Sequence, residues 1–131
     1  MSRSGYSEDC ENINLYRGRV ARAVRGRRGQ AFLREMGTAL DAMEVKELIT
    51  DEIVTEDGQA CAIGAVALAR GLDVSALDVE DSDAVADVFG IAPCLAAEIA
   101  FENDEAWGRQ TPAERWERMR KWVDENTKEK G

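Results

Sequence analysis

The segment ACAIGAVALAR, residues 60–70, constrains the fold more than any other part of the chain. It has helical composition but is apolar on almost every side, and such a helix is stable only when other elements surround it. Arg70 suits the negative end of a helix, and Gly71 suits the left-handed position that follows one. Gly64 lets another element approach closely. The segment predicts a central helix wrapped by the rest of the chain.

Apolar residues at helical spacing, together with capping residues, predict further helices around this centre. The predicted ranges are 12–25, 30–43, 82–89 with Val85, Val88 and Phe89 inward, 93–101, and 112–126 after a Thr111–Glu114 capping box. Residues 102–110 are expected to form a loop. Residues 45–59 leave two interpretations open, a helical face or a short two-stranded β-ribbon closed by Asp57-Gly58.

The sequence therefore predicts a mainly α fold, a compact single domain of five to six helices with a β-ribbon as the open alternative at 45–59. We expect a flexible leader at 1–11, one helical domain at 12–126 and a frayed tail at 127–131. No apolar run approaches the length of a membrane span, and the N-terminus lacks a signal-peptide segment. A cytoplasmic protein without membrane contact is expected.

Histidine is absent from the chain, which limits the chemistry available to it. Ser-His-Asp and Cys-His mechanisms and histidine metal sites are excluded, as is the usual acid–base group near neutral pH. The three cysteines are widely spaced, without a C-x-x-C pair, so neither a disulfide framework nor a zinc site is indicated. We expect a protein that is not an enzyme, with no catalytic residues, cofactor or metal.

Cys61 is the residue that most resembles a nucleophile, because it stands at the start of the central helix. A helix N-terminus can activate a thiolate. The acidic neighbours Glu56 and Asp57 oppose this, and the following turns are apolar. Packing is the preferred interpretation, with Cys61 acting as a small buried hydrophobe.

Charge is distributed unevenly along the chain. Residues 1–34 carry a net charge of +5 and the remainder −14. Six arginines fall within twelve residues of the first helix and its end, beside Tyr16 as a possible stacking group. They form a candidate face for nucleic acid or for a second protein contact. Its members are Arg17, Arg19, Arg22, Arg25, Arg27 and Arg28.

The acidic remainder offers the opposite hypothesis. Carboxylates spaced along a surface can imitate a phosphate backbone and occupy a basic groove on a protein that handles nucleic acid. The predicted protein-binding residues are Asp73, Asp78, Glu80, Asp81, Asp83, Asp87 and Trp107. The segment VADVFGIAPCLAAEI has helix-turn-helix spacing, but its second helix is acidic and would repel phosphates. In FENDEAW, residues 101–107, Asn103 and Asp104 are expected to arrange a loop.

Five blocks carry a resemblance: SRSGYSEDCEN, RGRRGQAFLREM, ACAIGAVALARGLD, VADVFGIA and FENDEAW with TPAERWERMRKWV. In this order, from Ser2 to Val123, they resemble a group of small proteins encoded by tailed bacteriophages and prophages. The resemblance implies a phage accessory protein in the cytoplasm of a bacterial host, and transfers no catalytic residue.

Together these observations predict a non-enzymatic protein that binds a host or phage partner through its acidic surface. The most specific form of this prediction is an inhibitor of a bacterial anti-phage defence system such as CRISPR-Cas or restriction, acting on a complex that handles nucleic acid. The alternative is a nucleic-acid-associated accessory protein that uses the arginine-rich first helix. Whether the chain forms a homodimer is left open.

Overall fold

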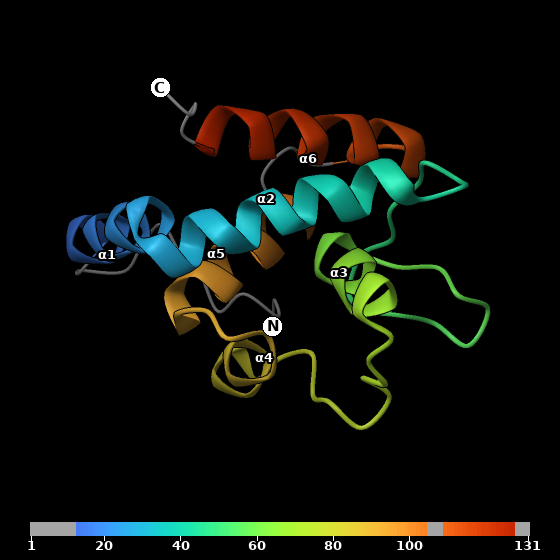
Figure 1. Cartoon of the computed structure of the whole chain (residues 1–131), viewed down its shortest axis with the longest axis horizontal. Helices are drawn as coiled ribbons and strands as arrows, with labels where there is room; N and C mark the ends of the chain where they lie inside the picture. Colours follow the sequence, from blue (N-terminus) through green and yellow to red (C-terminus); the bar gives the residue numbers. More distant parts are fainter. Residues whose placement is uncertain (1–12, 105–108, 128–131) are drawn as a thin grey trace.

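A computed structural model describes residues 13–104 and 109–127, and over these residues the chain is mainly helical, as predicted. The predicted leader, most of the predicted tail, and Trp107 lie outside the described residues. Figure 1 shows the helices packed around one another rather than in an open array. The helices of the described part are α1 (Ile13–Arg25), α2 (Arg27–Ala42), α3 (Ala62–Arg70), α4 (Ser82–Phe89), α5 (Pro93–Asp104) and α6 (Pro112–Asn126).

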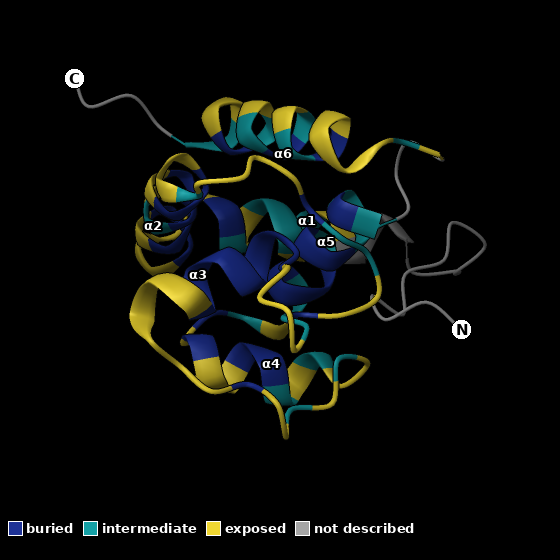
Figure 2. Ribbon diagram, turned by 90° about the vertical axis from the view of Figure 1, so that its right-hand side faces the viewer, coloured by how far each residue is buried: buried dark blue, intermediate teal, exposed yellow. Residues whose placement is uncertain are grey.

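Helix α3 lies at the centre for most of its length, which confirms the interpretation of the apolar segment. Residues 60–67 are buried, whereas Leu68, Ala69 and Arg70 are exposed. Helix α5 shares the centre, because Leu95 and Ile99 are completely buried. Figure 2 shows α3 and α5 as largely buried ribbons, with α2, α4 and α6 turning exposed residues outward around them.

The start of α3 is held by close backbone packing and by a buried amide. A Cβ atom at Gly64 would collide with the carbonyl oxygen of Ile53, so only glycine fits there. Asn103 on α5 accepts a hydrogen bond from the backbone N–H of Ala62 at 3.1 Å and donates one to the carbonyl of Ile49 at 2.9 Å. Asn103 therefore joins α5, α3 and the segment before α3.

The segment 45–59 is neither the helix nor the ribbon that the sequence left open. Its only described strand-like pairing is one antiparallel bridge between Val54 and Ala60. A turn at residues 55–59 is closed by a bond from the Thr55 N–H to the Gln59 carbonyl at 2.8 Å, and the Leu48 N–H bonds to the distant carbonyl of Pro112 at 3.0 Å. Asp51 has a φ of 66°, in the left-handed region that a regular strand or helix does not contain.

Three local predictions need correction. Helix α2 begins at Arg27 rather than at residue 30, because Gly29 packs tightly on the carbonyl of Ala23 and continues the helix. Helix α5 runs to Asp104, so residues 102–104 are helical and not loop. Val88 is 45 % exposed and does not face inward.

The predicted capping box at the start of α6 is confirmed. The Thr111 hydroxyl accepts from the Glu114 N–H at 3.1 Å, and the Glu114 carboxylate accepts from the Thr111 N–H at 2.9 Å. No single helix in the described residues has both the length and the apolar composition to cross a membrane. The α4–α5 pair meets that test only when combined, across a bend of 106°.

Candidate nucleic-acid interface

A groove with a volume of about 470 Å³ lies where α1 ends, α2 begins and α5 begins. We call it the arginine groove. It is lined by Arg19, Arg22, Ala23, Gly26, Arg27, Arg28, Gly29, Ala92 and Cys94.

The sequence builds this corner through two glycines and one buried amide. Gly26 interrupts the helix, and its N–H still donates to the carbonyl of Arg22 at 2.9 Å. A side chain at Gly29 would collide with the Ala23 carbonyl, so the first turn of α2 sits directly on the last turn of α1. Gln30 is buried and donates to the carbonyls of Val24 and Asn126, at 2.6 Å and 2.9 Å. The corner between α1 and α2 is therefore held by the close packing of Gly29 on α1 and by the hydrogen bonds of Gln30 to α1 and α6.

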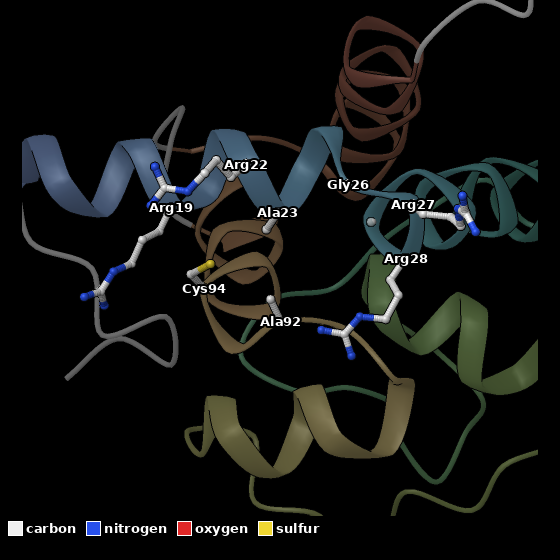
Figure 3. A pocket seen from close by; sticks show the side chains of 9 residues that line it. Arg19, Arg22, Ala23, Gly26, Arg27, Arg28, Ala92 and Cys94 are labelled. Atoms are coloured by element: carbon white, nitrogen blue, oxygen red, sulfur yellow. The ribbon is translucent and has the colours of Figure 1, made fainter.

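The arginines stand on the rim of the groove and small residues form its floor. Figure 3 shows Arg19 and Arg22 on α1 at one side, Arg27 and Arg28 on α2 at the other, and small side chains between the two pairs. All four arginines are exposed. Within the described part of the chain, none of the four makes a hydrogen bond or ion pair through its guanidinium. The floor side chains in the figure are Ala23, Ala92 and Cys94.

The helix starts at this corner add to the positive potential of the groove. The N-terminal end of a helix carries partial positive charge and favours anions. Gly26 is the N-cap of α2 and supplies no side-chain acceptor for the first amides of that helix. Helix α5 begins at Pro93, between the two floor residues Ala92 and Cys94.

The other two predicted arginines belong to a different hollow. Arg17 and Arg25 line a groove of about 290 Å³ together with Glu98 of α5 and Asn126 of α6. Burial raises the pKa of Glu98, repulsion from Glu102 raises it further, and the charge of Arg17 opposes both effects. The predicted arginine face is therefore two sites, of which only the arginine groove lacks an acidic lining residue.

The six acidic residues of the predicted protein-binding set are exposed and lie between the end of α3 and the end of α4. Three of these carboxylates accept hydrogen bonds from backbone N–H groups two or three residues further along the chain. The carboxylates of Asp73, Asp78 and Asp81 accept from the N–H groups of Ser75, Glu80 and Ala84, at 3.0, 2.9 and 3.0 Å. The hydrogen bond from the Ser75 backbone lowers the pKa of Asp73. Asp73 and Asp78 therefore stabilise the loop between α3 and α4, and Asp81 caps the N-terminus of α4.

The remaining predicted carboxylates are Glu80, Asp83 and Asp87. They are exposed, and their side chains have no hydrogen-bond or ion-pair partner among residues 13–104 and 109–127. No group of three or more cysteines and carboxylates in the described residues is arranged to hold a metal ion.

The side chain of Cys61 is buried and caps the N-terminus of α3. It is completely buried, and its Sγ atom accepts from the Gly64 N–H at 3.4 Å at the start of α3. A buried sulfur in this position stabilises the helix start and offers no access to a substrate, which supports the packing interpretation.

Ala92 and Cys94 are the groove residues that sequence reasoning missed. They lie far along the chain from the arginines, and neither residue type signals binding. Their role comes from the packing of α1 on α5, which nothing in the local sequence encodes. The structural interpretation of Asn103 is supported, although it works from within a helix and not from a loop.

No protein-family model, no curated protein and no solved structure matches this chain. The resemblance to phage-encoded proteins is carried by the quoted sequence blocks alone. Any function is therefore inferred from the chain's own residues and their geometry.

Proposed function

We propose that this chain is a non-enzymatic binding protein that holds the phosphate backbone of a nucleic acid in the arginine groove. The observation that carries the proposal is a set of four exposed arginines that line one groove and whose guanidinium groups have no partner among the described residues. Arginine binds phosphate through two parallel N–H donors and is only weakly hydrated, so it suits this role better than lysine.

The main competing explanation is that the acidic body of the same chain neutralises the arginines. This chain does pair arginines in that way elsewhere. Arg70 makes a two-point contact with Glu35, and Arg120 makes one with Asp41. Because the groove arginines are left out of such pairs, their charge is available to an external anion.

The test measures the affinity of a fluorescent oligonucleotide by anisotropy at two salt concentrations. Four phosphate contacts on a single strand predict a slope of log K against log salt of about −3. The double variant Arg22→Gln with Arg28→Gln is expected to halve that slope and weaken binding at least tenfold. The matched control is Arg34→Gln with Arg109→Gln, which removes the same charge from exposed positions outside the groove. Equal losses in both double variants, or the absence of salt-dependent binding, would overturn the proposal.

A second candidate function is the anti-defence inhibitor expected from the acidic surface and the phage resemblance. Glu80, Asp83 and Asp87 favour it, because three exposed carboxylates within eight residues are not consumed by local bonds. This candidate predicts that Asp83→Asn with Asp87→Asn abolishes capture of a basic host protein and protection of phage from a defence system. If that variant keeps both while the Arg22 and Arg28 variant loses nucleic acid, the acidic candidate is rejected.

A further inference from the structure

We infer that the arginine groove takes a single strand of nucleic acid and not a duplex, with a base seated on the small-residue floor between the two pairs of arginines. This inference rests on the proposed function and specifies its ligand. It depends on the shape of the groove, which has a charged rim and an uncharged, recessed floor.

The recessed floor is the feature that favours a single strand over a duplex. A duplex presents phosphates on its outer ridges and keeps its bases stacked inside, so it would touch the rim and leave the hollow empty. A single strand can turn an unstacked base away from its backbone into a hollow. The groove has a volume of about 470 Å³ and is open to solvent, so an unstacked base can enter it.

The floor is suited to the flat face of a base. Its side chains are small, because Ala23, Ala92 and Cys94 project little into the space that the rim arginines surround. Protein sites that accept single strands without reading sequence combine a basic groove with flat groups on which bases stack. No described aromatic residue lines this groove, so the planar group available for stacking is the guanidinium of Arg28, which Figure 3 shows extending toward the side where Ala92 lies.

The two arginine pairs fit a backbone that crosses the groove. Arg19 and Arg22 are three residues apart on α1 and so share a helix face, while Arg27 and Arg28 belong to the first turn of α2. Figure 3 places the pairs on opposite sides of the floor. Phosphates on either side of the seated base would each meet one pair.

The first experiment compares affinities for an oligonucleotide of about 12 nucleotides, as single-stranded DNA, single-stranded RNA and duplex DNA. We expect either single strand to bind at least tenfold more tightly than the duplex. Ala92→Phe fills the floor without changing the charge of the rim. It should weaken single-strand binding about tenfold and leave duplex binding unchanged. Ala31→Phe, at an exposed position of α2 outside the groove, is the matched control and should change neither.

A second measurement does not depend on a bulky substitution. Cys94 lines the groove, and Cys61 is completely buried. In a Cys10→Ser background, the single strand is expected to slow the alkylation of Cys94 at least fivefold, and the duplex to leave the rate unchanged.

The outcomes separate this inference from the function on which it rests. Equal affinity for single strand and duplex, both lost with Arg22→Gln and Arg28→Gln, would refute the single-strand inference and leave nucleic-acid binding intact. Unchanged Cys94 alkylation in the presence of saturating single strand would also refute it. No binding of any oligonucleotide would refute both.

Discussion

The same residue type plays two different roles in two regions of this molecule. Around α6 and the end of α3, arginines make hydrogen bonds and ion pairs that join distant parts of the chain. Arg115 donates to the carbonyl of Leu48 at 2.9 Å, and Arg118 pairs with Glu102 at 3.5 Å. At the junction of α1 and α2, the guanidinium groups of Arg22 and Arg28 make no hydrogen bond or ion pair with another described residue, and both side chains are exposed at the arginine groove.

The difference shows which charges the fold uses and which it leaves available. An arginine that is buried or paired stabilises the structure and cannot serve a partner without cost. An exposed arginine without a partner adds little to stability, and four of them around one hollow repel one another. This clustering adds no contact that stabilises the described part of the fold, which is why we propose a binding role for the arginine groove.

The largest expected effect lies in the partnered region, at Asn103. Replacing Asn103 by leucine leaves the Ala62 N–H and the Ile49 carbonyl without partners in a buried place. We expect a loss of about 3 kcal/mol in the free energy of unfolding, measured by urea denaturation. A loss below about 1 kcal/mol would show that Asn103 does not hold α3 and α5 together.

Arg115 and Arg22 provide the direct contrast between the two regions. Arg115 is 8 % exposed and donates to two backbone carbonyls, although its Nε atom has no partner. Arg115→Met is expected to cost about 2 kcal/mol in unfolding free energy. Arg22→Met should stay within about 0.5 kcal/mol of the parent protein. Similar costs for the two variants would remove the distinction between structural and available arginines.

The Glu35–Arg70 pair is expected to have a small and pH-dependent effect. The hydrogen bond from Arg70 lowers the pKa of Glu35, so the pair contributes stability above the ordinary glutamate value of 4.5 and loses it as the pH falls through the lower folded value. Glu35→Gln should cost about 0.5 kcal/mol at pH 7, discounted for solvent exposure. Thermal unfolding at pH 7 and pH 3 checks this, since the difference between variant and parent should become smaller at pH 3.

Glu98 is expected to show the smallest effect, with the opposite sign. Burial raises its pKa, so its favourable contribution is complete below 4.5 and is lost as the pH rises through the folded value. Glu98→Gln should therefore raise the melting temperature slightly at pH 7 and leave it unchanged at pH 4. A lower melting temperature at pH 7 would mean that the attraction of Arg17 outweighs the cost of burial.

The helices were predictable because their signals are local. The apolar segment before Gly71, the capping box at Thr111 and the break at Gly90 each act within a few residues, and each has its expected structural role. The path of residues 45–54 was not predictable, because its bonds include one from the Leu48 N–H to the distant carbonyl of Pro112. Local propensity decides little when tertiary contacts supply the hydrogen bonds.

The candidate site was predictable only in part. The arginine-rich segment marked α1 and the start of α2, but sequence could not show that Arg17 and Arg25 turn toward Glu98 and away from the arginine groove. Nor could it show that Asp73 and Asp78 accept hydrogen bonds from the N–H groups of Ser75 and Glu80. The first outcome depends on how the helices pack, and the second on the conformation of the loop between α3 and α4. Residue type alone determines neither.

The most direct test of the central claim is to map where a single-stranded oligonucleotide contacts the chain, by amide chemical-shift changes in NMR spectra. The arginine groove predicts the largest shifts at residues 19–29 and 92–94, with residues 115–120 unchanged. Shifts confined to residues 73–87, or spread evenly over the chain, would contradict the claim that the arginines without partners form the binding site.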